Sequence, residues 1–276
     1  MKILKWLRIF LLCLPKVIWD YFSYILPYSK KKDSIPLDER YRRVRKTVIF
    51  VLKKTKMHID FSGAEKIGQG SPKLYICNHA NFIDPLLMIA FNPRPMGVVA
   101  KKEVTKIPVA GKLLALIDGI FIDRDDPIST LRQFRDASKR FSGKMMDWLI
   151  FPEGTRNRFP YGVMNPFHAG TFKFATMGKL NVVPIYMFGQ HRLFDSVWFR
   201  NYPVQIKVFD EIPYQQISEE GTTQFAERMY GLINCEVQQA IENDRVYREE
   251  GKTKKKVKRW YTLSPMKELV GYGKKK

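Results

Sequence analysis

The sequence is poor in the residues that build disulfide frameworks and metal centres. It has three cysteines, Cys13, Cys77 and Cys235, which lie far apart and show no CxxC spacing. This odd and scattered set of thiols indicates neither a disulfide framework nor a zinc site, and it fits a reducing compartment. A Walker-type phosphate loop and a nucleophile elbow are also missing from the sequence. We therefore predict a protein without a bound metal ion.

A long uninterrupted hydrophobic run is missing as well, although residues 1–32 are rich in apolar and aromatic side chains. Charged residues punctuate this segment at Lys2, Lys5, Arg8, Lys16 and Asp20. No run reaches the roughly 18 residues that a membrane-spanning helix needs. The pattern predicts a helix at the membrane interface, a break near Pro15, and a second, aromatic-rich helix in or near one leaflet. The alternative is an amphipathic helix that packs on the protein's own core.

Acidic residues are scarce relative to basic ones. The chain has 48 lysines and arginines against 27 aspartates and glutamates, which gives a net charge of +21 at pH 7. Such a charge predicts attraction to anionic partners, namely membrane lipid, nucleic acid, an acidic carrier protein or a phosphorylated substrate. Charge alone does not choose among them. The basic tail from Gly251 onward is predicted to be either disordered or adsorbed to a membrane.

From about residue 57 the pattern changes to short apolar stretches that alternate with helical ones. The candidate strands are MHIDF, KLYIC, MGVVA, GIFID, DWLIF, NVVPIYMF and VQIKVF, with helices starting near Pro85, Pro108, Pro127 and Gly170 and a last helix from about Thr222 to Glu242. This order predicts an α/β fold with one mixed, largely parallel sheet flanked by helices. We expect three parts: membrane-anchoring helices and a linker at 1–40, an α/β domain at 41–245 and a basic tail at 246–276.

A histidine follows the second candidate strand in the stretch CNHANFIDP. His79 stands five positions before Asp84, which directly precedes a proline. On one helix these two side chains would point about 140° apart, so they can meet only across a turn. Two interpretations follow from the residues alone. Either Asp84 caps the helix that begins at Pro85, or the loop folds back and the two side chains form a His-Asp dyad.

A second polar stretch, FPEGTR, follows the candidate strand DWLI. It presents Glu153, Gly154 and Arg156 from one tight turn at the carboxyl end of a strand. Ligands of open α/β sheets bind at such ends, and the planar fork of an arginine can take two phosphate oxygens. The alternative is an ordinary turn with a surface salt bridge.

Together, the His79-x4-Asp84 and FPEGTR motifs resemble those of the glycerolipid acyltransferase family, most closely the 1-acylglycerol-3-phosphate acyltransferases. Three further stretches resemble the family in the same order: AKKEVTKIPVAGKLL at 100–114, GIFIDR at 119–124 and VPIY at 183–186. The resemblance covers about residues 57–190. It implies that His79 is the general base and that Asp84 orients its imidazole.

The resemblance also implies a set of substrate-binding residues. Arg124, Arg156 and Lys101 would bind the phosphate of the acceptor, and Glu153 would hold a glycerol oxygen. Gly154 would let the backbone approach the substrate or donate an N–H to the developing oxyanion. No acyl-enzyme is required, so Cys77 is expected to be only the last residue of a buried strand.

The implied reaction transfers an acyl group from acyl-CoA or acyl-carrier protein to the sn-2 hydroxyl of lysophosphatidic acid, which gives phosphatidic acid. No cofactor is expected besides this acyl donor. The alternative acceptors are another lysophospholipid or glycerol 3-phosphate, and the alternative of another class is a non-catalytic basic protein that binds membranes or nucleic acid. We expect a monotopic protein at the cytoplasmic face of a membrane, with no nucleic acid as partner.

Overall fold

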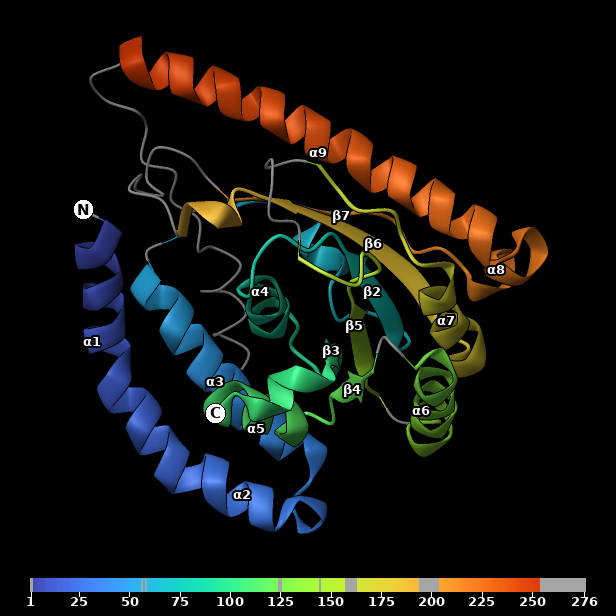
Figure 1. Cartoon of the computed structure of the whole chain (residues 1–276), viewed down its shortest axis with the longest axis horizontal. Coiled ribbons are helices and arrows are strands. Elements are labelled where there is room, and N and C mark those ends of the chain that lie inside the picture. The colour runs from blue at the N-terminus through green and yellow to red at the C-terminus, as the bar shows by residue number, and fades with distance from the viewer. Residues whose placement is uncertain are drawn as a thin grey trace.

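A seven-stranded mixed sheet forms the centre of the computed structural model, which describes residues 2–55, 57, 59–123, 126–143, 145–156, 163–193 and 204–253 (Figure 1). The strands are β1 (Ile59–Ser62), β2 (Lys73–Cys77), β3 (Met96–Lys101), β4 (Ile120–Ile122), β5 (Asp147–Ile150), β6 (Asn181–Phe188) and β7 (Val204–Val208). They are ordered β1-β7-β6-β2-β5-β3-β4, and only the β6–β7 pair is antiparallel. The predicted mixed, largely parallel sheet is confirmed.

Helices cover both faces of this sheet (Figure 1). One face carries α3 (Leu37–Thr55), α4 (Asp84–Phe91) and α5 (Pro108–Leu116), and the other carries α6 (Pro127–Arg140), α7 (Lys173–Gly178), α8 (Tyr214–Glu220) and α9 (Thr222–Thr253). Short 3-10 turns occupy Lys32–Ser34, Ala64–Lys66, Lys102–Lys106, Ala169–Phe172 and Gln190–Leu193. Helices α4, α5 and α6 each have a proline in their first two positions, where its missing N–H costs no intrahelical bond.

The double cover explains why the strands lack clean hydrophobic alternation. In β2 every residue is buried, with Tyr75 and Cys77 in the core under α3 and α4 and Leu74 and Ile76 in the core under α7 and α9. Successive strand residues point to opposite faces, so a strand that is buried on both sides needs apolar residues at consecutive positions. Burial of each such Leu or Ile stabilises the fold by about 1.5–3 kcal/mol.

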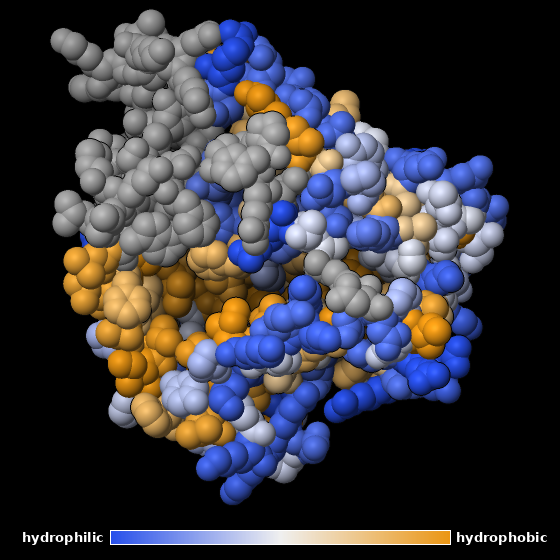
Figure 2. All heavy atoms as spheres, viewed as in Figure 1, coloured by the Kyte–Doolittle hydropathy of each residue, from blue (hydrophilic) through white to orange (hydrophobic). Residues whose placement is uncertain are grey.

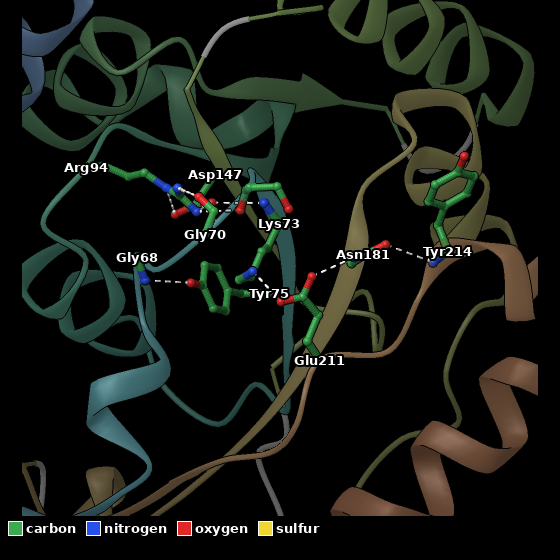
Figure 3. Close-up of polar contacts among 10 residues, drawn as sticks. Gly68, Gly70, Lys73, Tyr75, Arg94, Asp147, Asn181, Glu211 and Tyr214 are labelled. Atoms are coloured by element: carbon green, nitrogen blue, oxygen red, sulfur yellow. Dashed lines mark hydrogen bonds and ion pairs between the residues drawn. The ribbon is translucent and has the colours of Figure 1, made fainter.

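Buried polar contacts lock the amino ends of the central strands (Figure 3). Asp147, the first residue of β5, accepts hydrogen bonds from the backbone N–H of Lys73 at 2.9 Å and from Arg94 at 2.7 and 2.6 Å. The Lys73 ammonium pairs with Glu211, which also accepts a hydrogen bond from Asn181 at 2.6 Å. These contacts join β2, β5 and β6 at one end, so the loops at the opposite, carboxyl end stand on a fixed frame.

The N-terminal segment is one continuous helical stretch, and the predicted break near Pro15 is wrong. Helix α1 (Lys2–Asp20) includes Pro15, and it continues through a π-helical turn at Tyr21–Ile25 into α2 (Leu26–Lys30). Proline removes one intrahelical hydrogen bond and favours a kink, but it does not force the chain out of the helix where neighbouring packing holds it. Here α1 packs along α3.

A buried polar cluster fastens the end of this stretch to α3. The hydroxyl of Thr47 donates to Oδ2 of Asp20 at 2.6 Å and lies 2.7 Å from the hydroxyl of Tyr24. The opposite side of this helical stretch carries exposed apolar residues: Leu7, Phe10, Leu11, Ile18 and Trp19 on α1 and Phe22 in the π-helical turn. Figure 2 shows hydrophobic side chains gathered along the left edge of the molecule, where α1 runs in Figure 1. The stretch therefore combines packing on the protein's own core with an apolar outer face.

By length and composition alone, Leu7–Lys30 is also long and apolar enough to cross a membrane, which is weak evidence for a span. The domain boundaries predicted after residues 40 and 245 fall inside α3 and α9, and the division stays a prediction. Most of the basic tail, residues 254–276, lies outside the described residues.

Candidate active site

The motif residues follow the carboxyl ends of neighbouring parallel strands. His79 comes after β2 and the FPEGTR turn after β5, and these two strands are adjacent in the sheet. Lys101 is the last residue of β3, the next strand along. Arg124, which comes soon after β4, lies outside the described residues. Parallel strands bring their carboxyl ends to the same edge, so this edge carries the candidate active site.

His79 and Asp84 are joined by a hydrogen bond. Nδ1 of His79 lies 2.9 Å from Oδ2 of Asp84, a carboxylate that is 0% exposed. The same oxygen accepts hydrogen bonds from the backbone N–H groups of Ala80 at 2.9 Å and Asn81 at 2.8 Å. The carboxylate thus turns back toward the loop instead of capping α4. Of the two interpretations of the sequence, the capping role is wrong and the His79–Asp84 contact is present, while the catalytic role of the pair stays a prediction.

The chemistry of this pair sets the tautomer of His79. An ionised carboxylate only accepts hydrogen bonds, so Nδ1 carries the proton that it shares with Asp84. This leaves Nε2 with a free lone pair that can accept a proton. The His79 side chain is 16% exposed, which is enough to reach a substrate while its far side stays buried.

The ring of Phe151 lies flat against the imidazole. The two ring centroids are 4.1 Å apart and the planes are inclined by 24°. Phe151 is the first residue after β5, so the strand end fixes its ring beside β2 and the loop that follows it. Stacking and the Asp84 hydrogen bond together restrict the rotation of the His79 side chain.

Glu153 lies deeper, at 1% exposure, and its two oxygens face two different segments. Oε1 accepts a hydrogen bond from the backbone N–H of His79 at 2.7 Å, and Oε2 accepts one from the backbone N–H of Asn165 at 2.8 Å. Burial raises the pKa of Glu153 to about 7, and the nearby charge of Asp84 acts in the same direction against the two hydrogen bonds. The predicted contact with a glycerol oxygen stays a prediction.

Comparison with known proteins agrees with this arrangement. Residues 58–188 match the protein family described as Acyltransferase. This part of the chain is therefore similar to the Acyltransferase family. The match coincides with the span in which the motifs were recognised.

Two curated relatives named 1-acyl-sn-glycerol-3-phosphate acyltransferase are similar to part of this chain. The protein of Cocos nucifera is 30% identical over 161 residues, which cover 58% of this chain and 52% of the relative. That of Limnanthes douglasii is 36% identical over 135 residues, or 49% of this chain and 47% of the relative. The chain therefore spans about half the length of these curated relatives.

A solved structure resembles the whole fold. The crystal structure of the 1-acyl-sn-glycerophosphate (LPA) acyltransferase PlsC from Thermotoga maritima aligns with a TM-score of 0.64 at 17% identity, and it covers 87% of this chain and 97% of its own. At this identity the likeness concerns the fold alone. It agrees with a sheet covered on both faces and an N-terminal helical segment.

The sequence analysis missed the role of two asparagines, Asn78 and Asn81, that hold the His79 loop. The Asn78 side chain donates to the carbonyl of Met187 at 2.9 Å and accepts from the N–H of Met187 at 2.8 Å, so it prolongs the pairing of β2 with β6. Asn81 donates to the carbonyl of Gln190 at 3.3 Å. Their position on either side of His79 was the available signal, because buried amides in a loop replace missing backbone partners.

Two of the predicted cationic ligands, Arg156 and Lys101, lie at the surface. Arg156 is exposed and makes no ion pair within the part of the chain that the structure describes. Lys101 is exposed and lies 3.4 Å from Glu103. Gly154 has a φ of +70°, and its N–H donates to the carbonyl of Phe151 at 3.0 Å, so glycine is required here by the turn itself.

Cys77 is buried at the end of β2. Burial raises the pKa of its thiol well above the ordinary value, and the charges of Asp84 and Glu153 add to this effect. A thiolate is therefore disfavoured, which agrees with a structural role for this cysteine. His168 is exposed, and its contact with the FPEGTR turn is through its backbone N–H, which donates to the carbonyl of Pro152 at 2.9 Å.

Proposed function

We propose that this protein is a 1-acylglycerol-3-phosphate acyltransferase, which transfers an acyl group from a thioester to the sn-2 hydroxyl of lysophosphatidic acid. The observation that carries the proposal is the hydrogen bond of 2.9 Å between Nδ1 of His79 and Oδ2 of Asp84 at the carboxyl end of the sheet. The names of the relatives in coconut and Limnanthes support the acceptor. The product would be phosphatidic acid.

The proposed reaction is a direct transfer. Nε2 of His79 takes the proton of the acceptor hydroxyl while that oxygen attacks the carbonyl carbon of the thioester. The tetrahedral intermediate then collapses, the C–S bond breaks, and the departing thiolate takes the proton from the imidazolium. Asp84 stabilises the imidazolium form of His79 between these two proton transfers. A positioned base contributes about 10²- to 10⁴-fold, and holding both substrates together supplies much of the remaining acceleration.

The acceptor would be held by cations at the same edge of the sheet. We assign Arg156 the main role, because its guanidinium can take two phosphate oxygens and makes no ion pair within the described residues. Lys101 and Arg124 are the further candidates, and Arg124 lies outside the described residues. Gly154 would allow the backbone to approach the substrate. The reaction as proposed needs no metal and no cofactor besides the donor.

The donor would be acyl-CoA or acyl-carrier protein. Both are acidic, and a chain with a net charge of +21 attracts either of them as well as an anionic bilayer. The exposed apolar face of the N-terminal helical stretch supports a monotopic attachment, with Trp19 and Phe22 among the residues that would enter the headgroup region. We propose the cytoplasmic face of the membrane, where such donors are made.

An assay of thiol release tests this function. Purified protein is mixed with vesicles that contain lysophosphatidic acid and with either acyl-CoA or acyl-carrier protein, and free thiol and phosphatidic acid are measured. We expect both products to appear with at least one donor. Parallel reactions with another lysophospholipid or with glycerol 3-phosphate identify the acceptor. Binding of nucleic acid without thiol release for any donor would contradict the proposal.

The His79→Ala variant tests the base. We expect thiol release to fall by about 10²-fold or more while vesicle binding is unchanged. His168→Ala is the matched control, because His168 is exposed and contacts the FPEGTR turn only through its backbone N–H. Turnover at the wild-type rate in His79→Ala would exclude the proposed base role.

A further inference from the structure

Glu153 connects three segments that are far apart in the sequence. Its carboxylate joins the His79 loop, the FPEGTR turn and the segment at Asn165 through bonds of 2.7 and 2.8 Å. The Asn165 segment is itself anchored on α9, because the Phe167 ring packs edge-on against Tyr230 with centroids 5.7 Å apart. The His79 loop is thus tied through one carboxylate to a rigid part of the opposite helical layer.

We propose that Glu153 is a positioning residue, which fixes the backbone of His79 so that Phe151 and Asp84 can hold the imidazole in one orientation. The motif resemblance instead suggests that this carboxylate binds a glycerol oxygen. Two observations favour the positioning role. The side chain is 1% exposed, and each oxygen already accepts a hydrogen bond from a backbone N–H.

The position of the His79 N–H beyond the sheet explains why the His79 loop needs an acceptor such as Glu153. His79 lies three residues beyond Ile76, where the β2–β5 ladder stops, and two beyond Cys77, the last residue of β2. A buried backbone N–H without an acceptor would pull the loop toward another partner or toward water. The carboxylate satisfies this N–H from the neighbouring strand's turn. It therefore links the loop after β2 to the turn after β5 beyond the end of the ladder, and so fixes the position of the His79 backbone.

The Glu153→Gln variant tests the proposal. Glutamine has one carbonyl oxygen and one NH2 group, so only one of the two backbone N–H groups keeps its acceptor and the other meets a donor. We expect kcat to fall by about 10- to 100-fold, as displacement of a catalytic group by about 1 Å does, with the acceptor KM within about twofold of the wild-type value. Glu153→Asp keeps the charge but shortens the reach, and we expect a similar loss.

A measurement without substrates makes the test independent of the reaction. The chain has four histidines, so ring-labelled protein gives a small set of imidazole signals that single His→Gln variants assign. We expect the His79 signal of Glu153→Gln to shift or broaden while the signals of His58 and His191 stay in place. The His79 signal can be measured and interpreted even if the protein releases no thiol. If the wild-type protein does not transfer acyl groups, the proposed function is wrong. The positioning role of Glu153 is then tested by the His79 signal alone.

Asp147→Asn is the matched control for general destabilisation. Asp147 is also a buried carboxylate that accepts a backbone N–H, but it lies at the opposite end of β5 (Figure 3). We expect this variant to lower the melting temperature without shifting the His79 signal. The two variants are compared at an equal loss of stability. If kcat then falls no further in Glu153→Gln than in Asp147→Asn, the positioning role is wrong.

Two further outcomes contradict the proposal. An acceptor KM that rises at least tenfold, with kcat and the His79 signal unchanged, would show that Glu153 binds substrate. Rapid exchange of the His79 backbone N–H in the wild-type protein, measured by hydrogen–deuterium exchange, would show that this group has no lasting acceptor. The exchange experiment needs no variant, so it decides the question even if Glu153→Gln does not fold.

Discussion

The Phe151 ring stacks on the His79 imidazole with 4.1 Å between their centroids, and the two residues follow neighbouring parallel strands. The same turn that supplies Arg156 therefore also provides the wall against which the proposed base rests. This links the two motifs physically. One motif carries the histidine and its carboxylate, and the other sets the plane in which the imidazole lies.

Replacement of Phe151 by leucine removes the flat surface while it keeps an apolar side chain of similar size. We expect kcat to fall by about 10-fold, because the stacked contact is worth about 0.5–1.5 kcal/mol and its loss lets the imidazole rotate. Steady-state kinetics measure the change. Phe141→Leu is the control, since Phe141 packs edge-on against Trp148 away from His79. Equal kcat in Phe151→Leu and wild type would contradict the role of the stack.

The strands and most helix starts could be predicted because local chemistry decides them. Stretches such as KLYIC are apolar at consecutive positions, and Pro108 and Pro127 sit where helices begin. The break expected at Pro15 shows the limit of such reasoning. Whether a proline ends a helix depends on what packs around it, and the contact of α1 with α3 is not visible in the local pattern.

The candidate site could be predicted in part for a similar reason. His79 and Asp84 were recognisable as a pair, but the sequence left capping and dyad formation open because the backbone of the loop decides between them. The contacts of Glu153 could not be foreseen. Two donors to it among the described residues are the backbone N–H groups of His79 and Asn165, and every residue except proline carries such a group.

Arg156 offers a test of acceptor binding. We expect Arg156→Ala to raise the KM for lysophosphatidic acid by about 10- to 100-fold, the effect of losing a charge-assisted hydrogen bond, with little change in the KM for the donor. Arg156→Lys should restore the affinity only in part, because an ammonium lacks the planar fork. Arg135→Ala, on the exposed side of α6, serves as the control. An unchanged acceptor KM in Arg156→Ala would remove this residue from the proposed phosphate site.

The raised pKa of Glu153 predicts a dependence of stability on pH. In the folded protein the pKa is about 7, above the ordinary value of 4.5, so the native state holds this proton more tightly than the unfolded state does. The contribution of the group to stability is fully present below pH 4.5 and is lost as the pH rises through 7. Asp84 and His79 face Glu153, and both remain in Glu153→Gln.

The difference in unfolding free energy between the wild type and Glu153→Gln therefore reports the contribution of Glu153 alone. We expect the free energy of unfolding of the wild type, minus that of Glu153→Gln, to decrease between pH 5 and pH 8, measured by urea denaturation at fixed ionic strength. A difference that is flat or that increases with pH would mean that Glu153 is not held in its protonated form by burial.

The apolar face of the N-terminal helical stretch predicts how the protein binds to lipid. Trp19 and Phe22 are 70% and 66% exposed, and transfer of each side chain into a bilayer interface would contribute about 1.5–3 kcal/mol. We expect the Trp19→Ser, Phe22→Ser double variant to reduce sedimentation with anionic vesicles at least tenfold at physiological salt. Ile128→Ser is the matched control, because Ile128 is 65% exposed on α6, which covers the other face of the sheet. Equal sedimentation of the double variant and the control would show that charge alone brings the protein to the membrane.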